Sequence, residues 1–142
     1  MNDPFHLSRF VEAQVGTYSG VVAELEREAK TGHWIWYIFP QIAGLGHSHM
    51  SRKFAISSKD EARAYFEHPV LGPRLIECIE LVLAIEGKSA EQILGHIDAL
   101  KFRSCLTLFA AVESDTDVCR RALEKYFGGV ADPFTAEALS TS

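Results

Sequence analysis

The residues best suited to chemistry lie in one stretch, residues 29–59, which holds four Lys or Arg side chains and three His but no Asp or Glu. Its second half reads IAGLGHSHMSRK and combines two glycines with hydroxyls and a guanidinium, supplied by Gly44, Gly46, Ser48, Ser51 and Arg52. Glycine lets the backbone approach a ligand closely, and a guanidinium matches the oxygens of phosphate or carboxylate. The segment therefore predicts a site for an anionic small molecule, although ordinary loops are also rich in glycine and serine.

Four aromatic side chains precede this loop, in the run His33–Phe39 that ends at Pro40. At helical spacing Trp34 and Tyr37 lie on one side of the segment and Trp36 on another, so the aromatic side chains do not all fit into one buried layer. We expect Trp34 or Trp36 to edge the pocket, where a base or ring of the ligand can stack on it.

A second polar pattern crosses the most apolar part of the chain, residues 98–112. Asp98, Lys101, Ser104 and Thr107 recur at every third residue and trace a narrow polar ribbon along a helix. In one interpretation the ribbon is the floor of the pocket and Lys101 is its fixed cation. In the other, which the residues alone favour, Asp98 caps the helix, Lys101 pairs with an acid or reaches water, and the hydroxyls bond carbonyls one turn earlier.

Three histidines, His33, His47 and His49, suggest a metal site as a further alternative. A His-x-His pair on a glycine loop lacks a second ligand pair, and no acid nearby completes a site, so exposed loop histidines are the simpler interpretation and no metal or other cofactor is expected. His33 could instead take part in proton transfer. The chain lacks the P-loop and dinucleotide-binding glycine patterns, and its spacing reveals no catalytic triad, so whether it catalyses a reaction stays open.

The remaining pattern is helical and predicts a single all-α domain over residues 1–142, an orthogonal bundle of about six to eight helices with one central buried helix. Its core spans residues 5–127, and residues 132–142 form a frayed tail. The segment 33–39 has strand propensity, but a lone strand has no partner, which favours a short helix there. The expected helices are Phe5–Gln14 behind an Asp3–Pro4 start, Thr17–Lys30 ended by Gly32, His33–Phe39, one opening at Ser57 or Ser58 with Glu61 and reaching His68, Pro73–Glu86, Ser89–Leu94, a buried one over Asp98–Val112, and Ser114–Phe127.

Composition narrows the class of protein. With 142 residues, 47% of them hydrophobic and 23% charged, the chain is typical of one globular domain, and its net charge of −5 argues against nucleic-acid or anionic-membrane partners. Cys78, Cys105 and Cys119 occur singly in apolar helical patterns, as reduced core thiols do, and Cys105 as a nucleophile is the rarer alternative. No signal peptide and no apolar run near the ~20 residues of a membrane span is present, so we expect a cytoplasmic protein.

Long segments of the chain resemble one family. FVEAQ, HWIWYIFPQIAGLGHSHMSRKFAIS, EARAYFEHPVLGPRLIEC and DALKFRSCLTLF are similar to the bacterial domain of unknown function 1810 family, from Phe5 to Phe127. The resemblance implies an all-α multihelical fold and brings no established activity with it; some members carry the label calpastatin-like, but nothing in these residues supports protease inhibition. The positions that match the family motif are Trp34, Trp36, Tyr37, Phe39, Pro40, Gln41, Gly44, Leu45, Gly46, Ser48, Ser51, Asp98, Lys101, Ser104 and Thr107.

Two functions from different classes follow from these patterns. In the first, a nucleotide or phosphorylated metabolite binds between the 41–52 loop and the Asp98–Thr107 helix, in contact with Trp34, Trp36, Gln41, Gly44, Gly46, Ser48, Ser51, Arg52, Lys101 and Ser104. In the second, the protein is a non-enzymatic interaction module, whose exposed aromatic block and loop meet a protein partner while the polar ribbon is structural. The oligomeric state cannot be read from the sequence.

Overall fold

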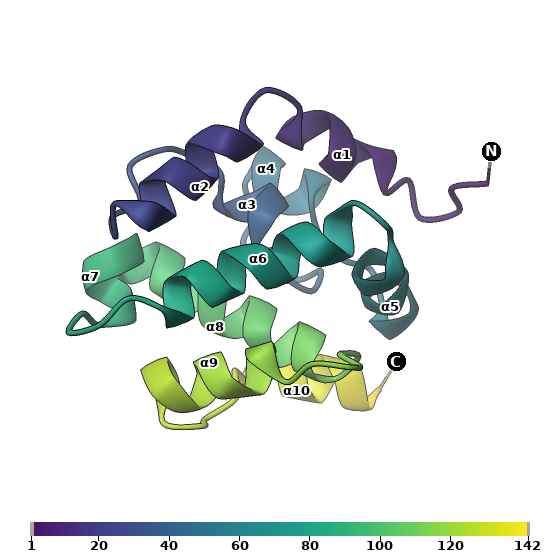
Figure 1. The fold of residues 1–142 in the computed structure, drawn as a ribbon. Helices are drawn as coiled ribbons and strands as arrows, with labels where there is room; N and C mark the ends of the chain where they lie inside the picture. Colours follow the sequence, from purple (N-terminus) through teal and green to yellow (C-terminus); the bar gives the residue numbers. More distant parts are fainter. Residues whose placement is uncertain (1, 142) are drawn as a thin grey trace.

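A computed structural model describes residues 2–141, and within that range the chain is a single all-helical domain (Figure 1). Ten helices occur there, two more than the upper end of the expected range, because α4 forms inside the glycine loop and α10 in the C-terminal segment. No helix in the described range is long and apolar enough to cross a membrane. The helices are α1 (Ser8–Gln14), α2 (Tyr18–Glu26), α3 (Ile35–Ile38), α4 (His49–Lys53), α5 (Lys59–Glu67), α6 (Leu71–Leu83), α7 (Ala90–Leu94), α8 (His96–Ala110), α9 (Val118–Phe127) and α10 (Pro133–Ser140).

The helix α8 is the central buried helix, as its apolar sequence predicts. It contacts α3, α5, α7, α9 and α10, and Figure 1 shows it between α6 and α9. Its side chains Phe102, Cys105, Leu106, Leu108 and Phe109 are fully buried. Burying a side chain such as Leu or Phe stabilises the folded state by about 1.5–3 kcal/mol. The residues that pack around α8 therefore form the main hydrophobic core.

The aromatic segment forms the short helix α3 and not a strand, and the chain leaves the helix just before Pro40. Phe39 packs its ring 4.7 Å from the ring of Phe102 on α8, between centroids. The ring centroid of Trp34 lies 6.0 Å from that of Phe39. These contacts fix α3 on the core and decide which of its aromatic side chains reach the surface.

Two predicted helix starts are confirmed by their hydrogen bonds. Ser58 caps α5, where its hydroxyl accepts the amide of Glu61 at 3.1 Å. Glu61 does not complete the reciprocal bond to Ser58; its carboxylate accepts from the amide and hydroxyl of Ser57 instead. Ser89 and Gln92 form a complete capping box on α7, which ends at Gly95 as expected.

The N-terminal boundaries differ from the expected ones. The helix α1 begins at Ser8 rather than directly after Asp3–Pro4, and the Asp3 carboxylate accepts the amides of Leu7 and Ser8. The helix α2 ends at Glu26, because Glu28 adopts a left-handed conformation with φ of +66°, so Gly32 is not its terminator.

The C-terminal part of the chain also corrects the expectation. The helix α9 begins at Val118 rather than Ser114. Where a frayed tail was expected, α10 begins behind Asp132, whose carboxylate accepts the amide and hydroxyl of Thr135. Thr135 is fully buried, and α10 packs on α8. The sequence does not reveal this helix, because its apolar residues form only a weak stripe; its cap and its packing on α8 stabilise it.

Candidate anion-binding site

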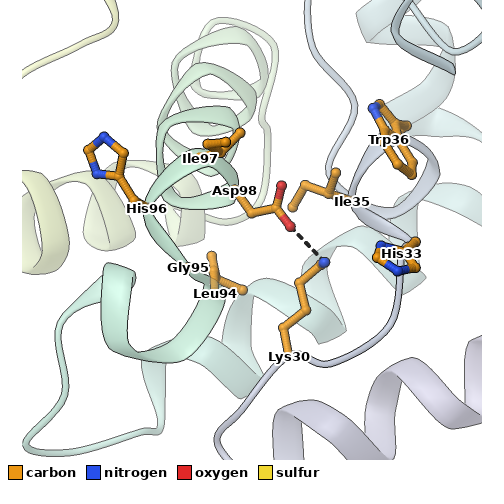
Figure 2. A pocket seen from close by; sticks show the side chains of 9 residues that line it. All are labelled: Lys30, His33, Ile35, Trp36, Leu94, Gly95, His96, Ile97 and Asp98. Atoms are coloured by element: carbon orange, nitrogen blue, oxygen red, sulfur yellow. Dashed lines mark ion pairs between the residues drawn. The ribbon is translucent and has the colours of Figure 1, made fainter. Parts of the chain in front are cut away.

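A hollow of about 430 Å³ opens at the N-terminal end of α8 (Figure 2). We call it the α8 hollow. One wall is the first turn of α8 and the end of α7, and the other is the segment that leads from α2 into α3. Its lining residues are Lys30, His33, Ile35, Trp36, Leu94, Gly95, His96, Ile97 and Asp98.

The first turn of α8 forms part of the wall of this hollow. Gly95 joins α7 to α8 with a φ of +92°, a conformation that favours glycine, and no side chain caps α8 in the described structure. The first amides of a helix have no partner inside the helix, and the helix dipole places partial positive charge there. This wall therefore favours negative charge, although Asp98 lies within it.

Asp98 is held between two lysines. Its Oδ2 lies 2.6 Å from Nζ of Lys30, whose side chain is only 7% exposed, and its Oδ1 lies 3.9 Å from Nζ of Lys101. Figure 2 shows Lys30 reaching across the hollow to Asp98. Two cations and one carboxylate leave this cluster with one net positive charge. The expectation that Asp98 caps α8 is wrong, because its carboxylate is engaged by lysines and not by backbone amides.

Lys101 connects this cluster to Trp36. Its Nζ lies 5.0 Å from the centre of the Trp36 ring, within the range of a cation–π contact. The indole N–H of Trp36 is buried and has no hydrogen-bond partner among the described residues. Such unpaired groups cost about 1–3 kcal/mol each and are rare in protein interiors. The fold thus brings Trp36 and Lys101 together.

The segment that carries Lys30 is ordered by Glu24 on α2. One oxygen of Glu24 accepts the amides of Thr31 at 2.7 Å and Gly32 at 2.9 Å, and also the indole N–H of Trp34 at 2.9 Å. Partial burial opposes ionisation, but these hydrogen bonds outweigh it and hold the pKa of Glu24 below its usual value. The amide of Lys30 also donates to the carbonyl of Ile93 on α7. Both walls of the α8 hollow are therefore tied together through the backbone.

The glycine loop bonds mainly to itself. The hydroxyl of Ser48 caps α4 by accepting the amide of Ser51, and it also donates to the Ser51 hydroxyl at 2.9 Å. A Cβ on Gly46 would lie 2.7 Å from that hydroxyl, and one on Gly44 would lie 2.7 Å from the ring of Phe134. The glycines thus permit close packing within the chain, and Ser48 caps α4.

Five other predicted residues do not line the α8 hollow. Trp34 is buried at 3% exposure, in the core and bound to Glu24. Ser104 is buried and donates back to the carbonyl of Leu100, and Thr107 does the same to Arg103, as the structural interpretation of the ribbon predicts. The carbonyl of Gln41 accepts the amide of Ile56. Arg52 is exposed and lines a different hollow, near the N-terminus.

Sequence reasoning missed Lys30 as the partner of Asp98. The two residues are far apart in the chain, and no local pattern connects them. The sequence offers only an indirect signal for this pair. A carboxylate on an apolar helix needs a cation, and Lys30 lies near the start of the acid-free segment 29–59. His33 is exposed at the rim of the hollow, and within the described residues no three His, Cys, Asp or Glu side chains gather as metal ligands.

Comparison with known proteins places the chain in a family. A model of the family described as "Protein of unknown function (DUF1810)" matches residues 4–139. The crystal structure of the conserved hypothetical protein Rv1873 from Mycobacterium tuberculosis is 46% identical in sequence and superimposes with a TM-score of 0.96, over 99% of this chain and 100% of that one. No curated protein matches the chain. The chain therefore belongs to the DUF1810 family, as the aromatic and glycine motif predicts.

Proposed function

We propose that this protein is a cytosolic domain that binds an anionic small molecule, a nucleotide or phosphorylated metabolite, in the α8 hollow. The observation that carries the proposal is the group of two lysines around one carboxylate at an uncapped helix N-terminus. The excess positive charge and the uncapped amides lie at the same end of α8, and both favour an anion.

The residues in and beside the hollow have different roles in this proposal. Lys101 does not line the hollow itself but lies next to Trp36 and Asp98, which do. It contacts the anion from there, because its side chain is 22% exposed and lies farther from Asp98 than Lys30 does. Lys30 is nearly buried and neutralises Asp98, so that this carboxylate does not repel the ligand. Trp36 offers an aromatic edge beside Lys101, where a ring of the ligand can pack.

The proposed site keeps Trp36 and Lys101 from the sequence-based prediction and omits the glycine loop as a direct wall. The hydroxyls of Ser48 and Ser51 are bonded to each other. Gly44 and Gly46 are closed by Phe134 and Ser51. The loop supports the fold around the site in this proposal, and the first turn of α8 supplies the amides that the loop was expected to supply.

A titration of two charge variants tests the proposal. ATP, AMP, a sugar phosphate and inorganic phosphate are titrated into wild-type protein, Lys101→Gln and Ile97→Asp by calorimetry. We expect at least one nucleotide or sugar phosphate to bind and both variants to weaken it by roughly ten- to a hundredfold, since hydrogen bonds to charged groups contribute about 1.5–3 kcal/mol. Ile97 is 66% exposed in the first turn of α8, so an aspartate there suits the helix while repelling an anion.

A matched control is Lys59→Gln, which removes the same charge outside the hollow. It should leave the affinity unchanged. The proposal is refuted if the panel produces no binding to wild type, or if Lys101→Gln and Ile97→Asp bind as tightly as Lys59→Gln.

A protein-interaction module is the second candidate, but its expected surface is not the one that the structure offers. Trp34 and Phe39 are buried, and Trp36 and Tyr37 pack against the core. Exposed apolar side chains lie instead on α8, where Ile97 is 66% exposed and Leu100 52%. Sedimentation of wild type and Leu100→Ser over a wide concentration range tests for self-association there: a dimer that Leu100→Ser dissociates would favour this candidate.

A further inference from the structure

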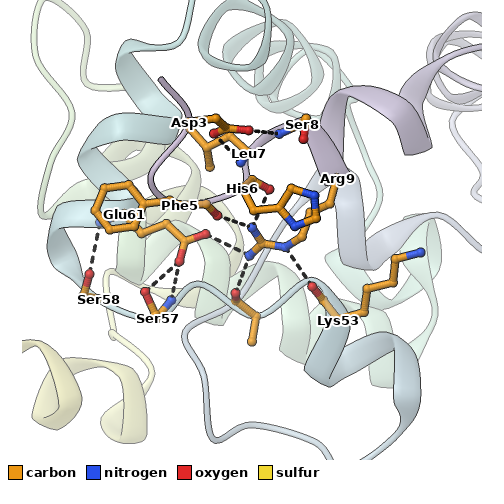
Figure 3. Close-up of polar contacts among 11 residues, drawn as sticks. Asp3, Phe5, His6, Leu7, Ser8, Arg9, Lys53, Ser57, Ser58 and Glu61 are labelled. Carbon is orange, nitrogen blue, oxygen red and sulfur yellow. Dashed lines mark hydrogen bonds and ion pairs between the residues drawn. The ribbon is translucent and has the colours of Figure 1, made fainter. Parts of the chain in front are cut away.

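A second hollow, also of about 430 Å³, lies between the segment before α1 and the connection from α4 to α5 (Figure 3). We call it the N-terminal hollow. Its lining residues are Pro4, Phe5, His6, Arg9, Arg52, Lys53, Ala55, Ser57 and Glu61. None of these residues lines the α8 hollow, so the two hollows are separate features.

Arg9 builds this hollow by joining its two walls. Its Nη1 donates to the carbonyls of Phe5 and His6, at 2.7 and 2.9 Å. Its Nε donates to the carbonyl of Lys53 and its Nη2 to that of Ala55, at 2.8 and 2.7 Å. With a further bond to Glu61 at 2.8 Å, all five N–H groups of the guanidinium are used. The shape of the hollow is therefore held by a partly buried side chain on its floor.

The hollow keeps an excess of positive charge. Glu61, its one lining carboxylate within the described residues, is 3% exposed and is satisfied by Arg9 and by the amide and hydroxyl of Ser57. Arg52 has no carboxylate partner in the described structure, and Lys53 has only the ring of Phe54, 5.3 Å away. A chain with a net charge of −5 thus leaves two adjacent cations uncompensated beside a preformed concavity.

The acids closest in sequence do not cancel this excess. Asp3 precedes the hollow, but its two oxygens accept the amides of Leu7 and Ser8 at the start of α1. Asp60 follows it and lies 3.5 Å from Arg63. Basic side chains in the last turn of a helix also complement the helix dipole, which alone would explain Arg52 and Lys53 on α4. This simpler explanation does not account for the concavity. It also does not account for the floor, where the N–H groups of Arg9 and the carboxylate of Glu61 already have partners.

We propose that the N-terminal hollow binds a phosphate group, free or carried as a monoester, through Arg52 and Lys53. The planar fork of Arg52 matches two phosphate oxygens, and Lys53 adds a point charge beside it. Arg9 has no free donor and serves as a positioning residue that holds the two walls. This site is independent of the ligand proposed for the α8 hollow.

The experiment is an NMR titration of the full chain with inorganic phosphate and with phosphoserine at constant ionic strength, against chloride as the reference anion. We expect saturable shifts of the amides of His6, Arg52, Lys53 and Ser57, and of the Arg52 Nε–H. The double variant Arg52→Gln/Lys53→Gln should weaken phosphate binding at least about tenfold, because two charge-assisted contacts are lost. The tighter of the two probes shows whether the site prefers free phosphate or a monoester.

Two controls separate a site from general surface attraction. Arg120→Gln/Arg121→Gln removes the same charge from adjacent cations on α9 and should leave the titration unchanged. Lys101→Gln should leave the phosphate-dependent shifts of the four amides named above unchanged, so that the outcome here is independent of the ligand proposed for the α8 hollow. The proposal would be overturned by chemical shifts that do not saturate with phosphate concentration. It would also be overturned if the α9 double variant weakened phosphate binding as much as Arg52→Gln/Lys53→Gln does. Both double variants change exposed side chains, and unaltered melting curves confirm that they are folded.

Discussion

At the scale of single residues, Glu24 shapes the candidate site without lining it. One of its oxygens orders the turn after α2, binds the indole of Trp34 and thereby fixes the direction from which Lys30 enters the α8 hollow. A charged acceptor makes stronger hydrogen bonds to backbone amides than a neutral one does. The stability of the turn should therefore depend on the ionisation of Glu24.

Glu24→Gln is expected to lower the free energy of unfolding at neutral pH by an amount that vanishes in acid. The pKa of Glu24 is lowered in the folded state, so its contribution is complete above its ordinary value of 4.5 and is lost as the pH falls through the folded value. Urea unfolding of wild type and variant between pH 7 and pH 3 measures the difference. Glu26→Gln, on the exposed side of the same helix, should show no such dependence; a Glu24→Gln difference that stays constant with pH would contradict the prediction.

At the scale of elements, the corner between α5 and α6 depends on one glycine. Gly72 lies in the first turn of α6, and a Cβ there would approach the carbonyl oxygen of Phe66 to 2.1 Å. A backbone oxygen cannot move away as a flexible side chain can. The close approach lets α6 begin directly after α5 and pack along it, and this arrangement places the buried stripe of α6 in the core.

Gly72→Ala should destabilise the protein by about 1–3 kcal/mol, the usual cost of forcing an extra carbon into a packed site. This is the opposite of the normal effect in a helix, where alanine is more stable than glycine by about 0.5–1 kcal/mol. Gly20→Ala in α2 is the matched control, because nothing lies within 4 Å of its Cβ position, and it should stabilise. Chemical denaturation of both variants gives the sign of each change in the free energy of unfolding. A stabilised Gly72→Ala would show that the corner is looser than described.

At the scale of the whole molecule, one core around α8 encloses all three cysteines. Cys78, Cys105 and Cys119 come from α6, α8 and α9 and are fully buried. Burial raises the pKa of the Cys78 thiol to about 12 and raises the pKa of Cys105 and Cys119 as well. Thiols of this kind are neither accessible nor ionised at neutral pH, which leaves Cys105 as a core residue rather than a nucleophile.

The three thiols should therefore report global unfolding. We expect native protein to react with Ellman's reagent only as fast as it unfolds, and three thiols per chain to react at once in guanidinium chloride. Ser19→Cys, on the exposed face of α2, supplies a positive control with one fast thiol. A fast native reaction of any of the three original cysteines would show a local opening of the core.

The sequence by itself determines the features that neighbours along the chain create. The cap at Ser58, the capping box of Ser89 and Gln92, and the apolar periodicity of α8 join residues a few positions apart, and all three are present in the structure. The sequence also places Trp36 and Lys101 among the candidate site residues. The helix α10 escaped prediction because its apolar residues form only a weak stripe.

Only the tertiary structure decided which charged side chains pair with each other and where the hollows lie. Lys30 pairs with Asp98, and Arg9 with Glu61 over 52 residues of chain. The local sequence does not identify either partner. A buried carboxylate needs a cation, but the residues around it do not show which Lys or Arg of the chain supplies that cation. The glycine loop looked open to a ligand, and packing closed it with its own serines and Phe134. Long-range packing sets which donors remain free, so the candidate site moved from the loop to the first turn of α8.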